Sequence, residues 1–327
     1  GEGEIGAVTP ATGNRFILDL REIGGALGDL GTLLPLMLGV IAVAGLAPTP
    51  VLLGFAAFYL ATALVYRLPI PVQPMKAVAA VLLTAQISGA ELVASGVAIG
   101  AVMLLLGITS WIDRVARAVP QSVLAGLQLG LGLALALVAL GLLGTAPVAG
   151  AMILGLLLAL LLVPRYPAAL IALVAAIVLA QVLEVPGIGF PGEPAAGFAL
   201  PALPTLAELR QSLTVLVLPQ LSLTLTNAVL ITALLAGDYY GPKAAHVTPA
   251  RLSVTTGLAN LLLTPFGALP MCHGAGGLAA HHRFGARSGT APLLLGLALA
   301  ALALAPGRLG LELLAAVPAA GLGALLL

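Results

Sequence analysis

The 327-residue chain is strongly apolar, with 61% hydrophobic residues, 8% charged residues and a mean hydropathy of +1.16. Soluble domains carry charge on about a quarter of their residues, so this composition excludes that class and predicts an integral membrane protein. The net charge of +1 leaves no basic face for nucleic acid. The single cysteine, Cys272, excludes an intramolecular disulfide.

Apolar stretches that could cross a bilayer as helices of roughly 20 residues recur along the whole chain. Seven are expected near 24–45, 50–66, 74–88, 92–110, 120–144, 148–163 and 167–183. A loop rich in proline and glycine covers 184–204, and further spans are expected near 211–236, 249–265, 271–283, 288–305 and from about 310. The spans at 74–88 and 271–283 are short, which predicts two helices that do not cross the membrane completely.

Two pairs of segments indicate an internal repeat. Asp113–Leu129 resembles Leu311–Leu327 and shares its Ala-Val-Pro, and Gln73–Ala80 resembles His273–Ala280, both with an offset of about 200 residues. Chance similarity between apolar helices is the alternative, and the common offset argues against it.

The basic residues orient the chain. With a cytoplasmic N-terminus, only Arg210 and Arg308 fall outside, as expected when short cytoplasmic loops retain Lys and Arg. Seven is an odd number of spans, so the second repeat enters the membrane inverted. It stops early by this count, and we expect about 60 further residues after Leu327, the length of roughly three spans.

Prolines break the chain just before each short span. Proline forces the chain before Met75 to be extended, so Gln73-Pro74-Met75-Lys76 would lie at a helix N-terminus, and its mate would begin at Pro270–Gly277. Each helix N-terminus offers free N–H groups and about half a positive charge. Lys76 adds a full charge, and glycines allow a ligand close to the backbone. The pattern favours a secondary transporter that binds a compact dianionic oxyanion near the membrane midplane.

Each polar residue within a span has two interpretations. Asp29 is a ligand, or it couples or pairs with Lys76 so that both charges are neutralised. His273 matches Gln73 and is either a proton-coupling group or a neutral, hydrogen-bonded core residue. The polar face of the eighth span provides ligands or interhelical contacts. The predicted substrate-binding residues are Gln73, Met75, Lys76, Ala77, Gln220, Thr224, Asn227, His273, Gly274, Ala275, Gly276 and Gly277.

Other motifs carry less chemistry. His281, His282 and Arg283 are expected at the cytoplasmic end of the short span 271–283, as a basic anchor or solvated loop rather than a metal site. Gly25, Gly28 and Gly31 are expected to let helices approach closely. The sequence has no nucleotide-binding or catalytic-serine motif, so we expect neither an enzyme nor a cofactor.

Four motifs spread along the chain carry a family resemblance. They are GALGDLGTLLPL (25–36), PVQPMKAVAA (71–80), PQLSLTLTNAVL (219–230) and PMCHGAGGLAAHHRFGARSG (270–289). They resemble the molybdate transporters of bacteria and plants, which are distantly related to sulfate permeases and uracil/xanthine permeases.

The resemblance implies an all-α, seven-plus-seven inverted repeat in which a core domain moves against a gate domain. In this chain the core would comprise 15–112 and 211–308. The gate would comprise 113–185 from the first repeat and, from the second repeat, only the partial segment 309–327. Residues 186–210 would be an extracytoplasmic loop. The resemblance also implies molybdate as substrate, with sulfate as a near relative, and a multi-pass protein of the inner membrane.

Two other functions remain open at this stage. A passive anion channel would use the same charges, but it needs no pair of broken helices. A nucleobase permease would normally place a carboxylate where the eighth span has Gln220 and Asn227. The sequence leaves open molybdate against sulfate, a coupled proton and a homodimer.

Overall fold

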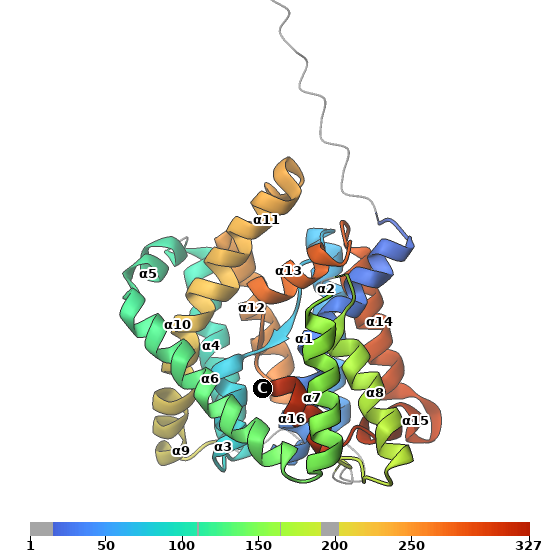
Figure 1. Ribbon diagram of the computed structural model, residues 1–327. Coiled ribbons are helices and arrows are strands. Elements are labelled where there is room, and N and C mark those ends of the chain that lie inside the picture. Colours follow the sequence, from blue (N-terminus) through green and yellow to red (C-terminus); the bar gives the residue numbers. More distant parts are fainter. Residues whose placement is uncertain (1–15, 110, 164, 191–202) are drawn as a thin grey trace, which may run out of the picture.

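The computed structural model describes residues 16–109, 111–163, 165–190 and 203–327. Residue 15 of the predicted core and residues 191–202 of the predicted loop 186–210 therefore lie outside the described residues. The helices and strands follow in chain order (Figure 1): α1 (Leu20–Ala44), α2 (Pro48–Tyr66), β1 (Gln73–Pro74), α3 (Lys76–Thr84), α4 (Gly89–Ile108), α5 (Ile112–Ala118), α6 (Gln121–Leu143), α7 (Pro147–Leu161), α8 (Ala168–Val182), α9 (Leu206–Gln211), α10 (Leu218–Leu223), α11 (Thr232–Tyr240), α12 (Pro249–Leu263), β2 (Met271–Cys272), α13 (Ala275–Arg283), α14 (Thr290–Leu304), α15 (Leu309–Ala315) and α16 (Ala319–Leu326).

The described helices fit a multi-pass membrane protein. Five of them, counting Leu206–Ala244 as one, are long and apolar enough to cross a membrane. The segments 212–217 and 224–231 of that helix are π-helical, an irregularity that the sequence did not indicate. α14 and the chain from Pro306 to Ala315 meet at a bend of 95°.

The packing confirms the inverted repeat. α2 packs against α14, and α4 packs against α12, which is the same contact with the two repeats exchanged. α3 and α13 have nine residues each. The matched Ala-Val-Pro segments end in Pro120 and Pro318, which have nearly equal backbone angles and precede α6 and α16.

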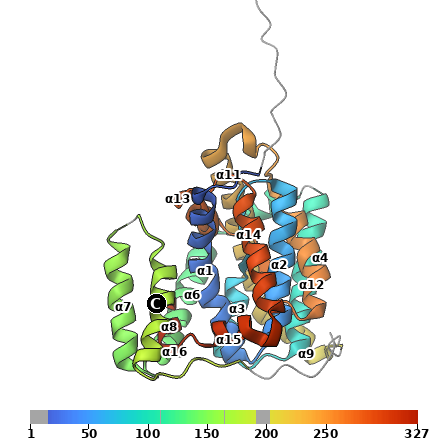
Figure 2. The ribbon, with the colours of Figure 1, turned by 90° about the vertical axis from the view of Figure 1, so that its right-hand side faces the viewer.

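Two groups of helices are visible in Figure 2. α7 and α8 lie together on one side with α16, whereas α2, α4, α12 and α14 lie on the other. α1 contacts members of both groups, because it packs against α13, α14 and α3 as well as against α8 and α16.

Glycines on α1 allow one of these contacts, as predicted. A Cβ atom at Gly28 would overlap the ring of Phe284, and one at Gly25 would overlap Ala286. The absence of side chains therefore brings the end of α13 directly against α1.

Candidate functional site

The two half-helices, α3 and α13, meet at a short antiparallel ladder. β1 pairs with β2 in the register Gln73↔Cys272 and Pro74↔Met271. The backbone N–H of Met75 donates to the Pro270 carbonyl at 3.0 Å. The side-chain amide of Asn260 holds β2 from α12, because it accepts from the N–H of Met271 at 2.9 Å and donates to its carbonyl at 2.6 Å. Segments some 200 residues apart in the sequence are thus joined, as the inverted repeat predicts.

Both half-helices begin at this ladder. Met75 and Gly274 are the N-caps, both extended and both without a side-chain capping hydrogen bond. Counted back from these caps, the residue that corresponds to Gln73 is Cys272 rather than His273. The sequence alignment is therefore one residue out of register at this point, because it matched residue types rather than helix starts.

A cavity of about 680 Å³ opens beside these helix starts. Predicted site residues in its wall are Gln73, Lys76, Gln220, Asn227, His273 and Gly274. The opposite wall comes from other helices and includes Gln128 of α6, Leu157 and Leu161 of α7, and Leu325 and Leu326 of α16. Lys76 is exposed to this space, although the residues on either side of it are buried. The structure therefore places a positive charge in this cavity.

Gln220 already occupies the start of α3. Its side-chain carbonyl accepts from the backbone N–H of Ala77 at 2.8 Å and from that of Val78 at 3.4 Å. Its amide nitrogen donates to the hydroxyl of Thr224 at 2.9 Å, so these two of the three residues predicted on the eighth span act together. Thr224 supports Gln220 from a fully buried position and does not line the cavity.

The start of α13 is more open. The first-turn N–H groups of a helix have no partner within the helix, and no acceptor is recorded for those of Ala275, Gly276 and Gly277 in the described part of the chain. Gly276 is exposed and lines an adjoining cavity of about 300 Å³. Gly277 lies so close to Gln73 that an added Cβ would be 2.6 Å from its Nε2.

The remaining predicted ligands are less accessible. Met75, Ala77, Ala275 and Gly277 are buried and are not part of the wall of the larger cavity. Their backbone N–H groups can reach a ligand in that cavity only after a small rearrangement.

Asp29 lies beside a different basic residue from the one predicted. Its Oδ2 lies 3.1 Å from Nε2 of His281, and both side chains are completely buried. Tyr59 donates its hydroxyl to the same carboxylate, and Gln73 Nε2 lies 3.5 Å from Oδ1. Lys76 instead faces the cavity. The expectation of a solvated His281 is therefore wrong, because the glycines of α1 let the end of α13 pack into the core.

His273 lines the cavity, but its ring is held on the other side. Nδ1 lies 2.9 Å from the Pro71 carbonyl and Nε2 lies 2.8 Å from the Thr255 hydroxyl. The rings of Phe58 and Tyr66 pack around it at centroid distances of 5.0 and 5.7 Å. This geometry favours the hydrogen-bonded core residue over the predicted proton-coupling group.

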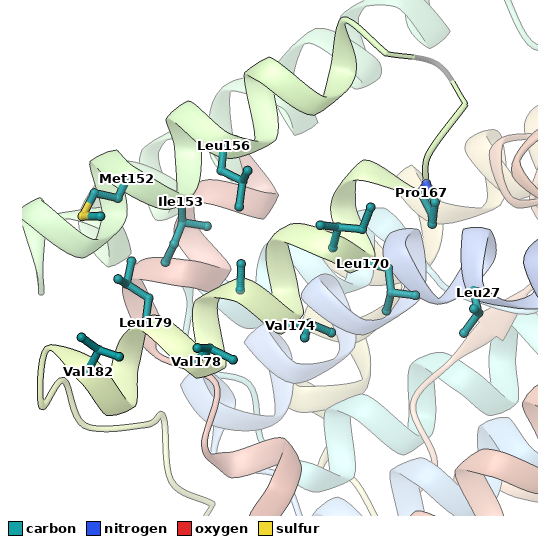
Figure 3. A pocket seen from close by; sticks show the side chains of 12 residues that line it. Leu27, Met152, Ile153, Leu156, Pro167, Leu170, Val174, Val178, Leu179 and Val182 are labelled. Carbon is teal, nitrogen blue, oxygen red and sulfur yellow. The ribbon is translucent and has the colours of Figure 1, made fainter.

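A second large cavity has a different character. It has a volume of about 700 Å³ and lies between α7, α8 and α1 (Figure 3). Its wall consists entirely of Leu, Ile, Val, Ala, Met and Pro side chains, so they offer no hydrogen-bond donor to an anion. Among the described residues there is also no cluster of three or more His, Cys, Asp or Glu side chains that could hold a metal.

Sequence reasoning missed His281, Tyr59 and Gln128. His281 stands in a span next to other basic residues, which made it look like part of a solvated helix end. Nothing in the sequence distinguishes Tyr59 from other tyrosines in apolar helices. Gln128 is a polar residue within the long apolar run of α6, and this was a signal that could have been used.

Comparison with known proteins gives consistent matches. The model of the family described as "Molybdate transporter of MFS superfamily" matches residues 21–135 and 212–327. Molybdate transporter 1 of Arabidopsis thaliana is 31% identical over 370 residues, covering 95% of this chain and 78% of the relative. Molybdate transporter 1 of Chlamydomonas reinhardtii is 29% identical, with 94% and 82% covered.

Solved structures with the same fold are more distant in sequence. The transmembrane domain of the cyanobacterial bicarbonate transporter BicA aligns with a TM-score of 0.69 and 18% identity, covering 95% of this chain and 88% of that one. The murine anion transporter Solute Carrier 26 family member A9, in an inward-facing state, aligns with a TM-score of 0.66 and 18% identity, with 95% and 60% covered. The inverted-repeat transporter fold, the broken helices around a charged cavity and the family match agree: this chain is a membrane transporter, not an enzyme, and it belongs to the molybdate transporter family.

Proposed function

We propose that the protein carries molybdate across the membrane and binds it in the 680 Å³ cavity at the start of the two half-helices. The observation that carries this proposal is the β1–β2 ladder, which brings both helix N-termini and Lys76 to one place. A tetrahedral dianion needs several N–H donors and positive charge around it. Lys76 and the amide side chains of Gln73 and Asn227 line the cavity and supply this chemistry. The N–H groups of the first turn of α13 join them after a small rearrangement.

Gln220 competes with the anion for donors at the start of α3. Its carbonyl oxygen now accepts from the N–H groups of α3, so an oxyanion and this oxygen compete for the same donors. If Gln220 rotates away, α3 offers its N–H groups to the anion. If it stays, the anion is bound mainly by α13 and Lys76.

The position of the cavity supports alternating access. One wall belongs to the proposed core, with Gln73, Lys76 and Gln220, and the other to the proposed gate, with Gln128 and Leu157. A movement of one wall along the other would carry the bound anion toward either membrane face. This elevator-like movement explains transport without a nucleotide site.

We further propose that the N-terminal end of α1 lies on the cytoplasmic side of the inner membrane. The N-terminal end of α1 and the end of α13 lie together, since the backbone N–H of Arg287 donates to Glu22 at 2.7 Å. The end of α2 and the loop before α12 also meet, since His246 Nε2 lies 2.8 Å from the Tyr66 carbonyl. Arg21, Arg67, Lys243, Arg251, Arg283 and Arg287 belong to these ends, which is the pattern expected of the cytoplasmic side.

Uptake into proteoliposomes tests the proposal. Labelled molybdate should accumulate with saturation, sulfate should compete in part, and uracil should not compete. Competition by uracil would favour a nucleobase permease, and flux without saturation would favour a channel. A failure of both oxyanions to enter or to bind would refute the proposed function.

A further inference from the structure

We infer that Gln128 of α6 is a ligand that the proposed gate contributes to the oxyanion, so that the bound anion is held from both walls of the cavity. The inference rests on the proposed function and deepens it. Gln128 lines the same cavity as Lys76 and Asn227. α6 also packs against α3 and α10, the helices that carry Lys76 and Gln220, so it borders the proposed anion site directly.

The side-chain amide of Gln128 is available to a ligand. After Gln121 and Ser122 at its start, α6 consists of Leu, Ala, Gly and Val apart from Gln128. Within the part of the chain that the structure describes, no protein group forms a hydrogen bond with the Gln128 side chain. A polar side chain inside a membrane helix is costly and commonly marks a substrate path. A contact between helices does not account for this residue, whereas two N–H donors for an anion do.

The residues around Gln128 show which face of α6 it occupies. Gln128, Gly132 and Leu135 follow one another at intervals of four and three residues, so they share one face of the helix, and all three line the cavity. An added Cβ at Gly132 would meet no atom within 4 Å. The space one turn from Gln128 is therefore open, and an anion can approach the amide there.

The inverted repeat brings the same position of both halves to the cavity. Gln128 follows Pro120, the N-cap of α6, by as many residues as Leu326 follows Pro318, the N-cap of α16. Gln128 and Leu326 both line the cavity. The fold thus places this position at the site twice, and only the first repeat has a hydrogen-bond donor there.

A ligand on the gate wall has a consequence for transport. Lys76 belongs to the proposed core and would move with the anion, whereas Gln128 would contact the anion only while both walls face it. A ligand stabilises the conformation that binds it more tightly. The contact with Gln128 therefore favours the conformation in which the anion lies between core and gate. The amide carries no fixed charge, so the contact can be given up as the walls move apart.

The test compares Gln128→Leu and Gln128→Glu with the wild type on the purified full chain in detergent. Calorimetry measures the Kd for molybdate, and a thermal melt with and without molybdate measures stability. We expect Gln128→Leu to raise the Kd about tenfold, as the loss of a hydrogen bond to a charged group implies. Gln128→Glu should raise it further, because a carboxylate repels the dianion. Without molybdate, Gln128→Leu should melt like the wild type, since it removes no hydrogen bond within the protein.

Gln121→Leu is the matched control. It is the same change on the same helix, at a residue that does not line this cavity, and it should leave the Kd unchanged. If Gln128→Glu does not fold, Gln128→Leu decides, because leucine is favourable in a membrane helix.

The outcomes separate this inference from the proposed function. An unchanged Kd in Gln128→Leu, a Kd in Gln128→Glu no higher than in the wild type, or an equal rise in Gln121→Leu overturns the inference and leaves the proposed function intact. Absence of molybdate and sulfate binding by the wild type overturns the proposed function, and the inference with it.

Discussion

Replacing Lys76 by alanine removes the full positive charge from the cavity and leaves the backbone of α3 unchanged. Lys76 is exposed to the cavity at the first position of the helix, and no ion pair is recorded for it within the described residues. A unit charge 4 Å from the anion would contribute about 4 kcal/mol per anion charge at an effective dielectric constant of about 20. Water in a cavity of about 680 Å³ screens this value, so a charge-assisted hydrogen bond of about 1.5–3 kcal/mol is the better guide.

We therefore expect Lys76→Ala to weaken molybdate binding by about 10- to 150-fold, the ratio that corresponds to this free energy. Lys76→Arg should retain part of the affinity, because the guanidinium keeps the charge but has a larger, planar shape. Isothermal titration calorimetry on the purified protein measures both, with Lys243→Ala as a matched control at an exposed lysine. Unchanged affinity in Lys76→Ala would remove Lys76 from the site and refute the reasoning.

Three further predictions concern the contacts around the site. Gly277→Ala should destabilise the fold by about 1–3 kcal/mol and weaken binding, because its Cβ would meet Gln73 and Asp29 at less than 3 Å. A thermal melt with and without molybdate measures both effects, and an unchanged melting temperature would contradict the close packing. Gln220→Leu should alter molybdate affinity, since it frees the N–H groups of Ala77 and Val78. A higher affinity would show that Gln220 competes with the anion, and a lower affinity that it helps to bind the anion. An unchanged affinity would exclude both roles. His273→Gln should lower thermal stability but keep the pH dependence of binding, because both ring nitrogens already have partners in Pro71 and Thr255. A flattened profile would restore His273 as the coupling group.

Much of the architecture could be read from the sequence. Apolar runs of membrane length and prolines before short spans are local patterns, and the repeat near 200 residues is found by comparing the chain with itself. These patterns predicted short helices within 74–88 and 271–283 and the inverted repeat that relates them, and the structure has the helices at Lys76–Thr84 and Ala275–Arg283. The glycines of α1 were likewise predicted to allow close packing, because a missing side chain has the same consequence in any contact.

What the sequence by itself determined, then, was the class of protein, the two broken helices and the charged residue that marks them. Which side chains meet was decided only by the tertiary structure. The sequence offered Lys76 as the partner of Asp29, whereas the packing of α13 against Gly25 and Gly28 placed His281 beside Asp29 and left Lys76 facing the cavity. Partners so distant in the sequence leave no trace in local composition, because a buried charge is neutralised by whichever group the fold brings within about 4 Å.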